Sequence, residues 1–248
     1  MSPVLEVVEL GVDFGGLRAV DDLSLSVDAD RIMGLIGPNG AGKTTTIDAL
    51  CGFVPAQGQI HLGTDRIDGQ PPHRRARAGL VRTFQSVELF DDLTVRENLL
   101  VAAITPRWWS SLVDAVAPHR SARGVEVEFA LDLVGLGALA GERPEALSHG
   151  QRRLAGVARA LANRPRLVLL DEPAAGLDPT ETAALGHVLR TLPDVGIGVL
   201  LVDHDMTLVL DVCDDITVMD FGRVIASGSP DAVRRDPAVV AAYLGGVV

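Results

Sequence analysis

A glycine-rich stretch near the start of the chain has the residue types and spacing that bind the phosphates of a nucleoside triphosphate. Its residues are Gly37, Pro38, Asn39, Gly40, Ala41, Gly42, Lys43, Thr44 and Thr45. They follow a short apolar run and precede an expected helix, which is the setting that this pattern requires. Glycines let backbone N–H groups curl around the phosphates, and the helix N-terminus adds partial positive charge. We expect Lys43 to neutralise phosphate oxygens and the Thr44 hydroxyl to ligate Mg²⁺.

Two adjacent acids after another apolar run suit the hydrolysis of such a nucleotide. Asp171 and Glu172 follow the run 167–170, which has the composition of a buried parallel strand. We expect Asp171 to hold Mg²⁺, directly or through water. Glu172 would then polarise the attacking water as general base. The alternative is that both acids merely cap the helix that follows.

The segment Leu147-Ser148-His149-Gly150-Gln151 distinguishes this chain from other proteins with a phosphate loop. It stands before a helical run and resembles the signature of the ABC transporter ATPases. The resemblance covers essentially the whole chain, because further motifs occur in the family's order. They are Phe14, Gln85, Asp171-Glu172, Ala175-Gly176-Leu177-Asp178 and His204. The commonest signature has glycine at the position of His149, but a bulkier residue there is known in the branched-chain amino acid branch, so nucleotide contact is still expected.

The resemblance implies ATP as the nucleotide and gives roles to residues outside the phosphate loop. Phe14 would stack on adenine through its π face. Gln85 would act as a metal ligand that senses Mg²⁺ and the attacking water, and segment 87–90 would touch a membrane subunit. His204 would donate to the γ-phosphate and orient the water beside Glu172. As alternatives, Phe14 is an ordinary strand aromatic and Gln85 belongs to a surface turn.

The family completes each nucleotide site with residues from two subunits. Ser148 and Gly150, together with Gln151, would contact the γ-phosphate of the nucleotide held by the facing subunit. Asp178 would help to couple the two sites, although its position before a proline also fits a helix N-cap. The resemblance therefore implies a dimer of ATPase subunits, either identical or paralogous.

Apolar patterning predicts the elements that hold these motifs. Alternation over 5–27 and a short strand at 59–62 favour an antiparallel sheet. The continuous runs 32–36, 167–170 and 199–202 favour buried parallel strands whose C-terminal ends carry function. We therefore predict an α/β fold: a P-loop (RecA-like) core with a mainly parallel sheet, an N-terminal antiparallel β subdomain and a helical subdomain.

Three segments with apolar residues at three-to-four spacing predict the helical subdomain. They are 95–104, 125–134 and 151–161. We divide the chain into an N-terminal part of the ATP-binding core (1–91), the helical subdomain with the signature (92–162) and a C-terminal part of the core (163–248). The stretch 106–123, which contains Trp108-Trp109, is the expected variable loop or insertion.

Composition limits the cellular setting and the classes of partner. The chain has 248 residues, with 22 Lys and Arg against 33 Asp and Glu, so we expect no nucleic-acid partner. Cys51 and Cys213 lie far apart and in no metal-ligand spacing, which favours reduced thiols in the cytosol. The sequence does not open on a basic start with an apolar run, and its apolar stretches are strand-length. We therefore expect neither secretion nor a membrane span.

Four segments narrow the resemblance to the ATPases of branched-chain amino acid importers. They are Arg82-Thr83-Phe84-Gln85, Asp171-Glu172-Pro173-Ala174-Ala175-Gly176-Leu177, His204-Asp205-Met206 and Ala242-Tyr243-Leu244-Gly245-Gly246. Such ATPases would work at the cytoplasmic face of the cell membrane with permease subunits and, indirectly, with an extracytoplasmic substrate-binding protein. The ATPases of urea importers and of lipopolysaccharide extraction share much of this pattern and stay open as alternatives. A soluble, non-transport ABC ATPase is more distant, because a long coiled-coil insertion and a duplicated motif set are both absent from the sequence.

Overall fold

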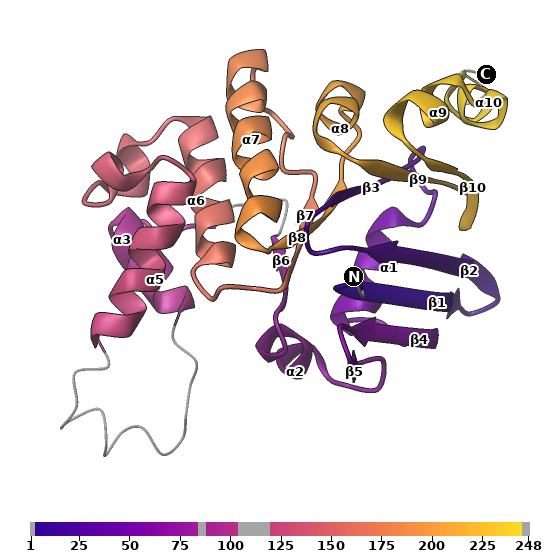
Figure 1. Ribbon diagram of the computed structural model, residues 1–248, viewed down its shortest axis with the longest axis horizontal. Helices are drawn as coiled ribbons and strands as arrows, with labels where there is room; N and C mark the ends of the chain where they lie inside the picture. Colours follow the sequence, from indigo (N-terminus) through magenta and orange to yellow (C-terminus); the bar gives the residue numbers. More distant parts are fainter. Residues whose placement is uncertain (1–2, 84–87, 104–119, 245–248) are drawn as a thin grey trace. The chain divides into compact units, whose positions relative to one another are not determined.

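The computed structural model of the chain describes residues 3–83, 88–103 and 120–244 (Figure 1). The chain divides into two compact units, one formed by residues 1–85 with 166–248 and the other by residues 86–165. The predicted α/β fold is confirmed, because the first unit holds two sheets with their helices and the described part of the second is helical. Several residues named above lie outside the described residues: Phe84, Gln85, the first residue of segment 87–90, Trp108, Trp109, Gly245 and Gly246.

A six-stranded sheet forms the centre of the first unit. Its spatial order is β10 (Arg223–Gly228), β9 (Asp215–Asp220), β3 (Ile32–Ile36), β8 (Gly198–Val202), β7 (Leu167–Asp171) and β6 (Leu80–Thr83). The strands from β9 to β6 run parallel, and β10 pairs antiparallel with β9. Every residue of β7 and β8 is buried, as their continuous apolar runs require. The C-terminal ends of β3, β7 and β8 therefore share one edge, where the predicted site residues follow.

A four-stranded antiparallel sheet lies beside helix α1 (Lys43–Cys51) in the same unit (Figure 1). Its order is β2 (Leu17–Val27), β1 (Leu5–Phe14), β4 (Gln57–Leu62) and β5 (Asp65–Arg66). Fully buried leucines of β1 and β2, such as Leu10 and Leu23, belong to the same apolar core as Ile47 of α1. The turn between β1 and β2 consists of Gly15 and Gly16, with φ of 53° and 101°, a conformation that other residues rarely adopt.

The remaining helices of the first unit follow or connect these strands. They are α2 (Pro72–Arg77), α7 (Pro179–Thr191), α8 (Met206–Val212), α9 (Pro230–Arg235) and α10 (Pro237–Leu244), with a 3₁₀ turn at Pro193–Val195. Helices α7 and α8 begin after Asp178 and Asp205, whose carboxylates each accept two backbone N–H groups of the first turn. Acid side chains thus fix the starts of the two helices that follow β7 and β8.

Arg75 of α2 completes the end of helix α1. Its side chain is buried, and Nη1 donates to the carbonyl oxygens of Ala49 and Leu50 at 2.8 Å each, while Nε donates to the carbonyl oxygen of Gln70 at 2.8 Å. The last carbonyls of a helix have no partner within the helix, so the guanidinium supplies the missing donors. Its positive charge also interacts favourably with the partial negative charge at the C-terminal end of the helix.

The described part of the second unit contains helices α3 (Val95–Ala102), α5 (Arg120–Leu133) and α6 (His149–Leu161), with 3₁₀ turns at Gly137–Leu139 and Pro144–Ala146. All three predicted helices are present, although α5 and α6 begin earlier than predicted. Buried Asn98 joins α3 to the loop before it, since its Oδ1 accepts from the N–H of Phe90 at 2.8 Å. Across the described ranges, none of the helices combines the length and the apolar character that crossing a membrane demands.

We expect Arg75→Ala to lower the free energy of unfolding by about 2–4 kcal/mol, because several buried carbonyl oxygens would lose their donor. Denaturant unfolding followed by circular dichroism measures this loss. Arg74→Ala is the matched control on the exposed side of α2 and should change stability by less than about 0.5 kcal/mol. Equal effects of the two substitutions would contradict the role given to Arg75.

Candidate nucleotide-binding site

The phosphate loop joins β3 to α1, and its backbone conformation requires glycine at two positions. Gly37 and Gly42 have φ of 153° and 101°, and a Cβ on either would collide with a backbone carbonyl oxygen, that of Met219 or Ala19 respectively. The loop is also tied to the turn between β9 and β10, because Gly222 N–H donates to the carbonyl oxygen of Ala41 at 3.0 Å. The backbone of β2 and of the β9–β10 segment therefore leaves no room for side chains at these two loop positions.

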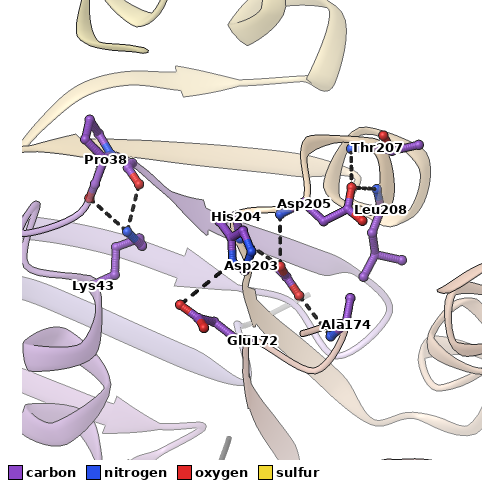
Figure 2. Close-up of polar contacts among 10 residues, drawn as sticks. Pro38, Lys43, Glu172, Ala174, Asp203, His204, Asp205, Thr207 and Leu208 are labelled. Carbon is purple, nitrogen blue, oxygen red and sulfur yellow. Dashed lines mark hydrogen bonds and ion pairs between the residues drawn. The ribbon is translucent and has the colours of Figure 1, made fainter. Parts of the chain in front are cut away.

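Lys43 is held inside the phosphate loop by the loop's own backbone. Its Nζ donates to the carbonyl oxygens of Gly37 at 2.7 Å and Pro38 at 2.9 Å, and the residue is only 8% exposed (Figure 2). Burial lowers the pKa of the Lys43 ammonium, and the charges of Glu172 and Asp171 act in the opposite direction. A phosphate oxygen bound in the loop could replace these carbonyl oxygens as the acceptor of the Lys43 ammonium.

A cleft of about 480 Å³ opens beside the loop. Its walls are Phe14, Leu17, Arg18, Ala19, Asn39, Gly40, Ala41, Gly42, Lys43, Thr44, Thr45, Glu172, Phe221 and Gly222. Phe14, at the end of β1, is 48% exposed, and Phe221, in the turn between β9 and β10, is 88% exposed. Two exposed aromatic rings at one cleft suit the faces of a nucleotide base. Phe14 is predicted from the sequence, whereas Phe221 is not, because no motif surrounds it.

Asp171 ends β7 and is almost completely buried. Its Oδ2 accepts from Nη2 of Arg82 at 2.8 Å, whereas no donor in the described part of the chain reaches Oδ1. A buried carboxylate oxygen without a donor is costly unless a cation or water binds it. Asp171 therefore has the chemistry of a ligand for a divalent cation.

Glu172 turns out of the strand and lines the cleft. Its backbone has φ of 48°, in the left-handed region, and its N–H donates to the carbonyl oxygen of Val202 at 2.7 Å. The side chain is 30% exposed, and its Oε1 lies 3.9 Å from Nδ1 of His204 (Figure 2). This backbone turn separates the two adjacent acids, so that one is buried at the strand end and the other is accessible to water.

Asp203, which is not among the residues predicted from the sequence, holds the backbone near both Glu172 and His204. Its buried Oδ1 accepts from the N–H groups of His204 at 2.7 Å and Asp205 at 2.9 Å, and Oδ2 accepts from Ala174 N–H at 3.1 Å (Figure 2). The carboxylate thereby connects the segment after β7 with the segment after β8. Its position directly after the apolar run 199–202 could have indicated it as a site residue, because such residues follow the C-terminal ends of buried parallel strands.

The signature residues belong to the second unit. Ser148 is the N-cap of α6: its Oγ accepts from Gln151 N–H at 3.2 Å, and Oε1 of Gln151 accepts from Ser148 N–H at 2.9 Å. Gly150 is buried in the first turn, and His149 is exposed. The contact of Ser148, Gly150 and Gln151 with a nucleotide stays a prediction, as does the coupling role of Asp178.

The chain matches two family models. The model for the ABC transporter family covers residues 20–175, and that for the branched-chain amino acid ATP-binding cassette transporter covers residues 223–248. The second match spans β10, α9 and α10 and so includes the C-terminal segment of the chain.

Full-length relatives and a solved structure are similar to this chain. It is 43% identical to the high-affinity branched-chain amino acid transport ATP-binding protein BraF of Pseudomonas aeruginosa, over 98% of each chain. It is 38% identical to the lipopolysaccharide export system ATP-binding protein LptB of Escherichia coli, over 97% of each. The crystal structure of the ADP conformation of an ATP-binding cassette of an ABC transporter superposes with a TM-score of 0.86 at 30% identity, over 99% of this chain and 100% of that one.

We expect Lys43→Ala to abolish nucleotide binding, because it removes the cation at the phosphates. Glu172→Gln should spare binding and slow hydrolysis about 10²- to 10⁴-fold, which is the usual contribution of a general base. A fluorescent nucleotide measures binding, and phosphate release measures hydrolysis. Asp194→Asn, at an exposed turn outside the cleft lining, is the control and should behave as the unmodified chain. Equal binding defects in the Lys43 and Glu172 variants would refute this division of roles.

Proposed function

The chain belongs to the ABC transporter family of ATPases, and from this premise we propose that it hydrolyses ATP to energise an importer for branched-chain amino acids. The match of residues 223–248 to the branched-chain cassette model is the observation that carries this cargo class. The identity to BraF over nearly the whole length supports it. We place the chain at the cytoplasmic face of the cell membrane, with permease subunits and a second ATPase subunit, and with an extracytoplasmic substrate-binding protein as an indirect partner.

Hydrolysis in this proposal uses the residues around the cleft of the first unit. The phosphate loop and Lys43 bind the β- and γ-phosphates, and Phe14 stacks on adenine. Glu172 accepts a proton from the water that attacks the γ-phosphorus, and its exposure in the cleft supports this assignment. His204 orients that water and donates to the γ-phosphate.

We assign Mg²⁺ to Thr44, Asp171 and Gln85. The buried Oδ1 of Asp171 has no donor among the described residues, and Thr44 is an exposed residue of the loop. A carboxylate oxygen and a hydroxyl are hard oxygen ligands of the kind that Mg²⁺ prefers. Mg²⁺, when bound, neutralises negative charge on the phosphates. The assignment of Gln85 rests on the family resemblance.

The second ATPase subunit completes the site in this proposal. Ser148, Gly150 and Gln151 lie at or within the first turn of α6, where backbone N–H groups and the helix dipole favour an anion. We propose that they contact the γ-phosphate bound by the facing subunit. Two nucleotides are then buried between two ATPase subunits.

Glu172→Gln should trap this ATP-bound dimer, because the nucleotide that joins the subunits would no longer be hydrolysed. Gel filtration with ATP and Mg²⁺, of the variant alone and with its natural partner ATPase, measures the association. The double variant Lys43→Ala/Glu172→Gln is the control and should remain monomeric. If the single variant is also monomeric in both preparations, the dimer proposal is wrong.

Two other cargoes stay as alternatives to branched-chain amino acids. The 38% identity to LptB favours lipopolysaccharide extraction as the second candidate, and urea import is the third. Cells that lack the gene should lose uptake of labelled leucine and keep uptake of labelled urea. A copy of the gene should restore leucine uptake, and a Lys43→Ala copy should not. Loss of urea uptake with normal leucine uptake would overturn the cargo assignment.

A further inference from the structure

Arg82 of β6 lies buried between two carboxylates from different elements of the first unit. Its side chain is 9% exposed; Nη2 donates to Oδ2 of Asp171 at 2.8 Å, and Nη1 pairs with Oδ1 of Asp48 in α1. Strands β6 and β7 are parallel neighbours in which Arg82 stands opposite Leu169, two residues before Asp171. The guanidinium therefore reaches the end of the adjacent strand from within the sheet.

The contact with Arg82 involves one oxygen of the Asp171 carboxylate and leaves the other for a different partner. Asp171 is 2% exposed, and no group in the described part of the chain donates to its Oδ1. A carboxylate that is anchored at one oxygen by a planar guanidinium has a fixed plane and a fixed direction for its second oxygen. Such outer contacts orient metal ligands and tune metal affinity.

We propose that Arg82 is a positioning residue for the metal site: by holding Oδ2 of Asp171, it reserves Oδ1 for the divalent cation that accompanies the nucleotide. This inference rests on the proposed role of Asp171 as a metal-holding residue. Arg82 itself touches neither nucleotide nor metal in this arrangement.

The second carboxylate explains why arginine suits this position. Asp48 lies five residues after Lys43 on α1, so Arg82 joins the helix that carries the phosphate-binding lysine to the strand that carries the metal carboxylate. A guanidinium can donate to two carboxylates from different nitrogens, whereas an ammonium is a single point of charge. Asp48 is 31% exposed, so water can replace the guanidinium there, but Asp171 has no such access.

The test measures how strongly Mg²⁺ increases nucleotide affinity, which is separate from hydrolysis. The probe is a non-hydrolysable ATP analogue, and the quantity is the ratio of its dissociation constants in EDTA and in saturating Mg²⁺, with the full chain. In Arg82→Met the affinity in EDTA should stay near that of the unmodified chain, because the phosphate loop is intact. The increase caused by Mg²⁺ should fall about 10- to 100-fold, as for other outer-shell partners of metal ligands.

Matched variants separate positioning from a merely structural contact. Arg82→Lys should restore part of the Mg²⁺ effect, and Asp48→Asn should retain most of it, because the bond between Arg82 and Asp171 is kept. An unchanged ratio in Arg82→Met, or equal losses in Arg82→Met and Asp48→Asn, would overturn the proposal in favour of a contact that only joins α1 to the sheet. Thermal unfolding of each variant reports on the stability contribution independently.

A double-mutant cycle covers the case in which Arg82→Met fails to fold because it leaves a buried charge unpaired. Asp171→Asn/Arg82→Met removes both charges, and its Mg²⁺ effect should equal that of Asp171→Asn alone. A further loss in the double variant would refute the route through Asp171. If Asp171→Asn keeps the full Mg²⁺ effect, the assignment of the metal to Asp171 fails first, and the role of Arg82 falls with it.

Discussion

The bonds between Lys43 and the carbonyl oxygens of Gly37 and Pro38 require a tightly curled loop, and much of the first unit keeps the loop in that shape. The turn between β9 and β10 closes over it through the bond from Gly222 N–H to Ala41. The same turn accepts a hydrogen bond from Asp21 N–H of β2 at the Gly222 carbonyl. Strands that are distant in sequence thereby converge on one short segment of backbone.

Burial of charge at the ends of β7 and β8 sets the second constraint. Asp171 and Asp203 are both nearly inaccessible to water, so their oxygens need partners from the chain or from a ligand. Asp203 accepts hydrogen bonds from backbone N–H groups, whereas among the described residues Asp171 has the Arg82 guanidinium at one oxygen and no donor at the other. This difference explains why Asp203 connects two segments of backbone, whereas Asp171 suits a cation.

Local sequence patterns predicted most of the fold and part of the candidate site. The runs 32–36, 167–170 and 199–202 predicted three central strands, since strands buried on both faces are apolar throughout. The start of α6 was predicted too late, although Ser148 and Gln151 have the spacing of a capping box. Phe221 and Arg82 could not be assigned, because their surroundings come from pairing between distant strands and no short motif records it.

His204 has a fixed backbone but an exposed side chain that forms no hydrogen bond with Glu172. Its backbone N–H is fixed by Asp203, yet its imidazole is 62% exposed and lies 3.9 Å from Glu172, beyond hydrogen-bond distance. A base and its orienting partner often approach closely only when the reacting group lies between them. Hydrogen bonds from the chain hold the carboxylates of Asp171 and Asp203, whereas the His204 imidazole is largely exposed. The proposed contact with a γ-phosphate and its water requires this exposure.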